Sequence, residues 1–207
     1  MKKTLSFISK TSSGMATGLF ATLIIGTILK QLFTLINFQI GIDIANVLMS
    51  LMGPGIALGV ALSINKDLSP LQLVSSMAIG GIASSINLLS PDNPIVTFTV
   101  NGGSKNPLLI YFVVVLTIII FNKIIKKKTS LDILLIPLMY VFIGSLLGFI
   151  LIYPCYYFIY AIQSIIEVSM PLIPIIMSMI ISVIMGMVLT MPISSVAVCV
   201  AISIGNT

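Results

Sequence analysis

Long uncharged runs of apolar side chains restrict this chain to a membrane fold. Residues 108–121 contain only aliphatic, aromatic and threonine side chains, and comparable blocks recur along the sequence. Only 7% of the 207 residues are charged, whereas soluble domains carry roughly 25%. Crossing a bilayer takes roughly 20 apolar residues, so this length allows about six to eight crossings. Because the apolar residues come in blocks rather than at amphipathic spacing, an ordinary soluble domain is excluded.

Proline, glycine and polar connections divide the apolar sequence into candidate membrane helices. We therefore predict an all-α fold, with residues 1–207 forming a single polytopic integral membrane domain. It would be a bundle of about seven to eight helices, several of them broken by Gly or Pro. The candidate segments are residues 12–36, 46–64, 71–89, 108–121, 132–152, 155–166, 171–190 and 193–204.

Segment 71–89 is the weakest candidate, because Ser, Gln and Asn dilute its aliphatic residues. Either a full crossing or a re-entrant loop fits it. The lysines favour a full crossing with the N-terminus in the cytoplasm, since the cluster at 123–128 then also faces the cytoplasm. A re-entrant segment would leave that cluster outside.

Small residues recur at every fourth position in several candidate helices. In lipid, such ridges let helix backbones approach closely, so they mark contact surfaces and predict a compact bundle. Block 108–121 has no ridge, and we expect it to face lipid. The ridges are Gly14, Gly18, Thr22 and Gly26; Gly55, Gly59 and Ser63; Ser76, Gly80 and Ser84; Gly144 and Gly148; and Ser178, Ser182, Gly186 and Thr190.

The residue types exclude several classes of function. The chain has no His and no Arg, and its formal charge of +5 comes from lysines beside apolar blocks. Such lysines determine topology, so no nucleic-acid partner is expected. Without His, paired carboxylates or a Gly-Lys-Ser/Thr phosphate loop, we expect no catalytic or phosphorylated residue, no metal and no other cofactor. Cys155 and Cys199 lack ligand spacing and are interpreted as buried, inert thiols.

Backbone breaks within apolar sequence are the main candidates for a functional site. Transporters bind polar solutes at such breaks, where freed backbone groups can contact the solute. The break in segment 46–64 is explained equally well as a packing kink. We interpret the break before segment 193–204 as functional. The residues assigned to the two breaks are Gly53, Pro54, Gly55, Pro192, Ser194 and Ser195.

Three further polar residues are candidates for solute binding. Ser12 and Ser13 stand at the start of the first candidate segment, before its apolar residues, where helix capping explains them as well as solute binding does. Glu167 would cost roughly 2.5–3.5 kcal/mol at a helix centre, so at depth it should face a cavity. Its place shortly before Pro171 favours an interfacial position instead.

Four motifs occur in an order that characterises one group of membrane proteins. They are residues 7–27, which include Ser-Lys-Thr-Ser-Ser-Gly-Met-Ala; residues 52–57, Met-Gly-Pro-Gly-Ile-Ala; residues 132–137, Asp-Ile-Leu-Leu-Ile-Pro; and residues 186–195, Gly-Met-Val-Leu-Thr-Met-Pro-Ile-Ser-Ser. Over nearly its whole length, the chain resembles an EIIC-like family of membrane subunits of the bacterial phosphotransferase system. Residues 87–109 depart from the family pattern, being polar and Asn-rich.

The resemblance implies a sugar permease subunit, multi-pass, in the bacterial cell membrane. Such a subunit binds a sugar within its bundle and alternates access, and cytoplasmic EIIB and EIIA proteins supply the phosphate chemistry. It would at most be the membrane part of an enzyme complex, commonly working as a homodimer. Family members continue with further helices after the Met-Pro-Ile-Ser-Ser motif, so we expect a partial copy. Two alternatives stay open: a non-transporting regulator or binding protein that keeps the fold, and an intramembrane enzyme or a transporter of another solute.

Overall fold

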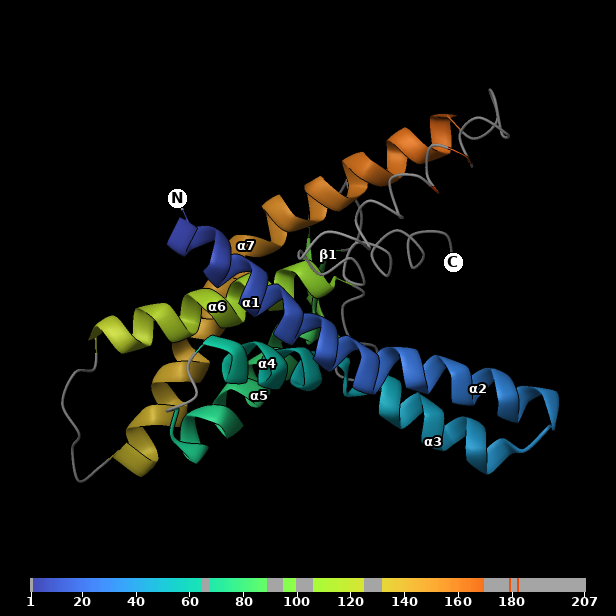
Figure 1. Ribbon diagram of the computed structural model, residues 1–207, viewed down its shortest axis with the longest axis horizontal. Helices are drawn as coiled ribbons and strands as arrows, with labels where there is room; N and C mark the ends of the chain where they lie inside the picture. Colours follow the sequence, from blue (N-terminus) through green and yellow to red (C-terminus); the bar gives the residue numbers. More distant parts are fainter. Residues whose placement is uncertain are drawn as a thin grey trace.

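The computed structural model describes residues 2–64, 68–88, 95–99, 106–124 and 132–169, together with residues 179 and 182. Within these ranges the regular structure is helical except for one short β-hairpin (Figure 1). The helices predicted at 171–190 and 193–204 lie outside the described residues, apart from those two positions.

The first membrane span is one long helix in three pieces. α1 (Lys2–Leu19) passes into a π-helical turn, η1 (Phe20–Ile24), and continues as α2 (Ile25–Leu35). Its 30 residues from Ser6 to Leu35 are apolar enough to cross a membrane. The predicted span at 12–36 is therefore confirmed, but the helix begins earlier than its apolar composition indicated.

The second span is broken near its middle. A turn containing Asn37, whose positive φ of 55° places it in the left-handed region, reverses the chain after α2. α3 (Gln39–Ser50) packs along α2, and α4 (Met52–Ile64) follows after a bend of 44° at Leu51. The distortion predicted for this segment is present, immediately before the Gly-Pro-Gly sequence. Taken together, α3 and α4 are apolar and long enough to form one broken span or a re-entrant loop.

α5 (Pro70–Ser85) is a short helix that ends in a β-hairpin. Its start is specified locally: the Ser69 side chain accepts from the Gln72 amide, the Gln72 side chain accepts from the Ser69 amide, and a proline occupies the first position. Strand β1 (Ile86–Leu88) then pairs antiparallel with β2 (Val96–Phe98). At 16 residues α5 is about 24 Å long, less than the roughly 30 Å of hydrocarbon in a bilayer.

The last two described helices are α6 (Pro107–Ile124) and α7 (Asp132–Ser169). Asn106 caps α6, since its side-chain oxygen accepts from the Leu109 amide at 3.1 Å. The two spans predicted at 132–152 and 155–166 are wrong, because α7 is a single helix with Pro154 inside it. A proline removes only one backbone hydrogen bond, and leaving the helix within lipid would expose more unpaired groups.

The number of membrane-crossing helices is known only for the described part of the chain. Among the described residues, three helices are long and apolar enough to cross, or four if the bent α3–α4 pair is one span. A polytopic membrane protein with a mainly helical fold is thus confirmed, and a count of seven to eight membrane helices is not. The small β-hairpin was not predicted.

Glycine ridges hold α1, α4 and α5 together. A Cβ atom added at Gly14 would overlap the Gly59 carbonyl, and one at Gly18 would overlap the Gly55 carbonyl, so α1 and α4 touch backbone to backbone. Without a hydrophobic force between helices in lipid, such close contact is what makes their association favourable. The ridge prediction is confirmed for these helices and for Gly144 of α7, which contacts Ile79 of α5.

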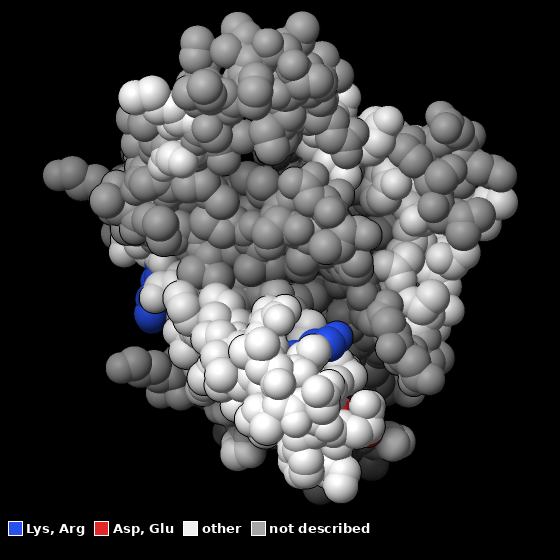
Figure 2. All heavy atoms as spheres, turned by 90° about the vertical axis from the view of Figure 1, so that its right-hand side faces the viewer, with Lys and Arg blue, Asp and Glu red and all other residues white. Residues whose placement is uncertain are grey.

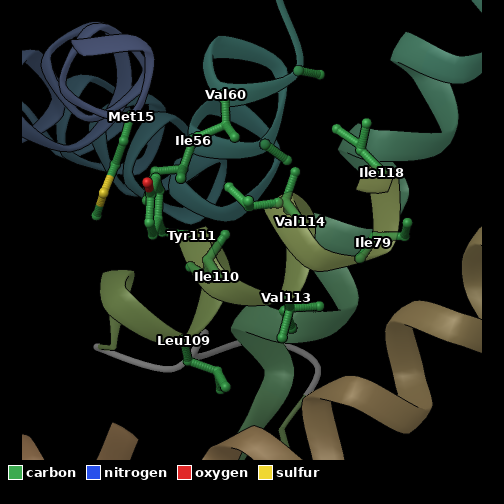
Figure 3. Packing of buried hydrophobic residues seen from close by; sticks show 14 of the residues in the cluster. Met15, Ile56, Val60, Ile79, Leu109, Ile110, Tyr111, Val113, Val114 and Ile118 are labelled. Carbon is green, nitrogen blue, oxygen red and sulfur yellow. The ribbon is translucent and has the colours of Figure 1, made fainter. Parts of the chain in front are cut away.

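The prediction that block 108–121 faces lipid is wrong. This block lies in α6, which passes between the other helices, and Val113, Val114 and Ile118 are fully buried there (Figure 3). In Figure 3, side chains from α1 and α4, among them Met15 and Ile56, lie against the same helix. Apolar side chains are satisfied equally well by lipid tails and by protein, so the absence of a ridge could not distinguish the two surroundings.

The chain repeatedly returns to the side of the bundle that holds its N-terminus. α4 runs antiparallel to α1, α5 antiparallel to α4, and α7 parallel to α5, as the glycine contacts along each interface show. The end of α6 lies beside the first half of α7, where the rings of Phe121 and Tyr140 contact each other at a tilt of 57°, with centroids 4.5 Å apart. Figure 1 shows the starts of α1, α5 and α7 and the ends of α4 and α6 at the left. The helix ends that flank the connections at 65–67 and 125–131 therefore lie on one side of the bundle, although the α5 helix is shorter than the hydrocarbon core.

Candidate functional site

The middles of two membrane-crossing helices identify the level of the bilayer centre. The span from Ser6 to Leu35 has its midpoint between Phe20 and Ala21. The apolar part of α7, Asp132–Ala161, has its midpoint close to Leu147. If both spans sit symmetrically in a bilayer, these two levels coincide at mid-depth.

The residues at both midpoints contact the region where the start of α4 packs against the end of α5. Near the first midpoint, a Cβ atom at Gly55 of α4 would lie 2.7 Å from Thr22 Cγ2 and 3.3 Å from the Gly18 oxygen. Near the second, a Cβ atom at Gly148 would lie 2.6 Å from Ile86 Cδ1, at the start of the β-hairpin. The contacting residues of α1 and α7 are within about 4 Å of their midpoints along the helix axes.

With both spans centred in a bilayer, three irregular backbone segments therefore lie near mid-depth. They are the π-helical turn after α1, the bend before α4 and the hairpin after α5. Irregular backbone at membrane depth is tolerated only where protein buries it or where it lines a water-filled space, and π-turns occur frequently at functional sites. We call this region the central junction, comprising Thr22, Gly53, Gly55, Gly80, Ser84 and the β1–β2 hairpin.

Neutral hydrogen-bonding groups supply the polarity of the central junction. The Asn87 side-chain amide donates to Thr99 Oγ1 at 2.6 Å, and the Thr99 amide donates to the Ser85 carbonyl at 2.9 Å. The hydroxyls of Ser84 and Thr22 donate to helix carbonyls, at 2.7 and 2.8 Å. Each hydroxyl keeps acceptor capacity and can rotate its proton, so these groups can exchange internal bonds for bonds to a polar solute.

Comparison with models of known protein families decides which class of membrane protein this is. Residues 9–206 match the family described as Phosphotransferase system, EIIC. The chain belongs to this family. No curated protein and no solved structure matches the chain significantly.

Membership in the EIIC family agrees with the apolar helices in making this a multi-pass membrane subunit of a phosphotransferase system. It implies, in general terms, a complex with EIIB and EIIA proteins. The family assignment inferred from the four sequence motifs is confirmed. Its match covers all four motifs except the first two residues of the one at 7–27.

Among the predicted site segments of the EIIC chain that the structure describes, one lies in the central junction. A Cβ atom at Gly53 would meet the Gly80 oxygen and the Ser84 side chain, and Pro54 Cγ lies 3.7 Å from the position of a Cβ at Gly81. The Gly-Pro-Gly sequence thus packs against the end of α5. The Gly-Pro-Gly sequence therefore has a packing function, which was one of its two interpretations from sequence. The same contact places it beside the Gly80 carbonyl and the Ser84 hydroxyl.

Ser12 and Ser13 lie elsewhere on the EIIC chain. Both are inside α1, so neither caps the helix, and they lie about 9 Å before the Gly18–Gly55 contact along the axis. Ser12 is buried and Ser13 is exposed, because neighbouring helix positions point about 100° apart. The structure does not bring them together with the Gly-Pro-Gly sequence.

The remaining predicted residues are distant or undescribed. Glu167 lies in the last part of α7, beyond the apolar span that ends at Ala161. Pro192, Ser194 and Ser195 lie outside the described residues. Solute binding by these four residues stays a prediction.

Sequence reasoning missed the polar residues of the hairpin and one buried contact between helices. Ser84, Asn87 and Thr99 come together only through strand pairing, although the polar dilution of segment 71–89 was a signal for them. In the second case, Thr11 Oγ1 of α1 lies 2.8 Å from the Tyr111 hydroxyl of α6, in a buried position. Thr11 and Tyr111 are 100 residues apart, so no local sequence pattern indicated their contact.

The central junction of this EIIC chain is suited to binding rather than to acid–base chemistry. Its polar side chains are hydroxyls and amides, and none of the described residues that define it is ionisable. Among the described residues, no group of three or more His, Cys, Asp or Glu side chains comes close enough to hold a metal ion. Such a site can orient a neutral hydroxyl-rich molecule, while bond-making steps would need groups from another protein.

Proposed function

We propose that this EIIC chain is a permease subunit that moves a sugar across the bacterial cell membrane for phosphorylation by EIIB, which EIIA recharges. The observation that carries the proposal is the meeting of three irregular backbone segments at mid-depth, lined by neutral hydrogen-bonding groups. Discontinuous helices at the bilayer centre are how many transporters expose backbone groups to a solute. A sugar offers the hydroxyls that Ser, Thr and Asn can bind.

The arrangement of the chain ends supports a cytoplasmic N-terminus. The connections at 65–67, which contains Lys66 and Asp67, and at 125–131, which contains Lys126, Lys127 and Lys128, join helix ends on the N-terminal side of the bundle. Positively charged short loops are retained in the cytoplasm. In this orientation the N-terminal side of the protein faces EIIB. We also propose that the subunit acts as one domain and forms a homodimer.

The decisive experiment is sugar phosphorylation by inverted membrane vesicles that contain this chain. Phosphoenolpyruvate, the general phosphocarriers and the cognate EIIA and EIIB are added with one radiolabelled sugar at a time. We expect at least one sugar to be phosphorylated only when this chain and EIIB are both present. If a sugar binds but none is ever phosphorylated or taken up, the chain is a binding protein or regulator that keeps the fold.

Substitution of Asn87 connects that activity to the central junction. Loss of a hydrogen bond to sugar is worth about 1–1.5 kcal/mol, so Asn87→Ala should weaken apparent sugar affinity by about tenfold. Asn122→Ala is the matched control, because Asn122 is exposed at the end of α6. Equal sugar affinity in the two variants, at equal amounts of folded protein, would remove the junction from the binding site.

A further inference from the structure

The α2–α3 hairpin extends from the bundle and carries two different surfaces. The helices pack on each other through small residues, since a Cβ atom at Gly26 would lie 3.3 Å from the Ala45 oxygen and one at Gly41 would overlap the Phe33 ring. Figure 1 shows the pair projecting at the right, with only the turn around Asn37 at its tip. The faces of α2 and α3 that do not pack on each other are exposed.

One set of exposed residues is polar and follows helical spacing. Members recur three or four positions apart on each helix, so each set forms a stripe along one face. Gln39 donates to Asp43 Oδ1 at 3.3 Å along the α3 stripe. The exposed polar residues are Thr27, Gln31 and Thr34 on α2, and Gln39, Asp43, Asn46 and Ser50 on α3.

A second exposed set is apolar and lies on the other flank of each helix. On α3, Ile44 is 58% exposed and Val47 is 62% exposed. The set comprises Ile25, Ile28, Leu32 and Leu35 on α2, and beside them Ile40, Ile44 and Val47 on α3 with Leu51 at the bend. In an antiparallel pair packed through Gly26 and Ala45, the helical repeat of about 100° per residue puts both polar stripes on one side and both apolar stripes on the other.

The polar side leads from the tip of the hairpin to the central junction. Gln39 begins the α3 stripe next to the tip, and Ser50 ends it immediately before the bend at Leu51. These residues span about 16 Å along the helix, about half the hydrocarbon thickness of a bilayer. Figure 2 looks onto this end of the molecule, whose described surface carries only isolated charges.

Lipid is an unfavourable neighbour for the polar side but a favourable one for the apolar side. An aspartate at the middle of a membrane helix costs about 2.5–3.5 kcal/mol, so polar residues at depth face protein or water-filled cavities. The apolar side chains on the other flank are stable in contact with lipid tails.

We infer that the polar side of the α2–α3 hairpin lines a water-filled half-channel from the outer membrane surface to the central junction, and that its apolar side faces lipid. The inference rests on the proposed function, since it supplies the route by which an external sugar reaches the site. The stripes offer amides and hydroxyls; Asp43 is the single charged residue among these exposed positions, and the partly buried Lys30 lies at helical spacing between Thr27 and Thr34. Such a lining suits a neutral hydroxyl-rich solute.

Cysteine accessibility tests this inference without any transport measurement. Cys155 and Cys199 are first replaced by alanine in the full chain, and single cysteines are introduced as Asn46→Cys and Ser50→Cys in α3. Ile44→Cys and Val47→Cys are matched controls at similar depth on the lipid side. A membrane-impermeant methanethiosulfonate is added from outside to intact cells. We expect the first pair to react at least tenfold faster than the second.

Two results would overturn the half-channel. One is equal, slow modification of all four cysteines, which would mean that lipid or protein covers the polar side. The other is efficient disulfide formation between two chains through Asn46→Cys, which would make the polar side a dimer interface. Fast modification of Asn46→Cys and Ser50→Cys in a chain that moves no sugar would refute the proposed function alone. Normal sugar uptake with unreactive cysteines would refute the half-channel alone.

Discussion

Gly53 of α4 and Gly80 of α5 lie so close that a methyl group on either would overlap the carbonyl oxygen of the other. This contact joins the bend before α4 to the last turns of α5, and so fixes two of the irregular segments of the central junction relative to each other. Close backbone approach of this kind is open to glycine alone.

Replacing Gly80 by alanine should destabilise the protein, whereas the same change at Gly81 should not. A Cβ at position 80 meets backbone of α4 and lies 2.5 Å from the Ala57 Cβ, but one at position 81 meets only Pro54 Cγ at 3.7 Å. Overpacking costs about 1–3 kcal/mol. We expect a lower thermal midpoint in detergent for Gly80→Ala and an unchanged one for Gly81→Ala. Equal midpoints would contradict the backbone contact.

The buried hydrogen bond between Thr11 and Tyr111 should couple α1 to α6. The Thr11 hydroxyl and the Tyr111 phenol lie 2.8 Å apart, and either oxygen can be the donor. Hydrogen bonds between membrane helices contribute about 0.6 kcal/mol, and up to about 1.7. A double-mutant cycle of Thr11→Val and Tyr111→Phe should measure a coupling in this range. Tyr157→Phe, at a 44% exposed position, is the control and should have no coupling to Thr11.

The C-terminal break carries a functional prediction that does not depend on the described residues. Pro192→Ala, or Ser194→Ala combined with Ser195→Ala, should impair sugar uptake and leave membrane insertion intact. The reason is that a broken helix near membrane depth offers backbone groups and hydroxyls to a solute. Uptake and the amount of protein in the membrane are measured together. Normal uptake in both variants would show that this break is not part of the site.

Glu167 is expected at a membrane surface rather than in a cavity at mid-depth. It follows the apolar span of α7, which ends at Ala161. In a chain without native cysteines, Glu167→Cys should therefore react rapidly with a membrane-impermeant thiol reagent added from the aqueous side that faces it. The control is a cysteine at Phe149, which is 50% exposed close to the middle of the span and should be slow. Slow modification of Glu167→Cys would favour the cavity.

The class of protein and the sites of close helix contact were predictable from local residue patterns. Uncharged apolar blocks indicate a membrane protein because the bilayer excludes unpaired charge. Small residues four apart predicted contact surfaces on α1, α4 and α5, since one helix turn brings them into a row, and the structure shows which helices these surfaces join. The bend beside Gly53 followed from the Gly-Pro-Gly sequence in the same way.

Other features depend on contacts between residues far apart in sequence. An apolar helix such as α6 has the same composition whether it faces lipid or protein, so its central position could not be read from residues 108–121. Likewise Pro154 alone could not show whether α7 would continue, because neighbouring protein can compensate one lost hydrogen bond.

The sequence by itself determined that this chain lies in a membrane, which family it belongs to, and which glycines allow helices to touch. Only the tertiary structure decided that a π-turn, a bend and a hairpin meet at one depth, and that the exposed polar residues of α2 and α3 fall on one side. The physical reason is that hydropathy and small-residue spacing are properties of single helices. Depth and sidedness arise only when helices from distant parts of the chain pack against each other.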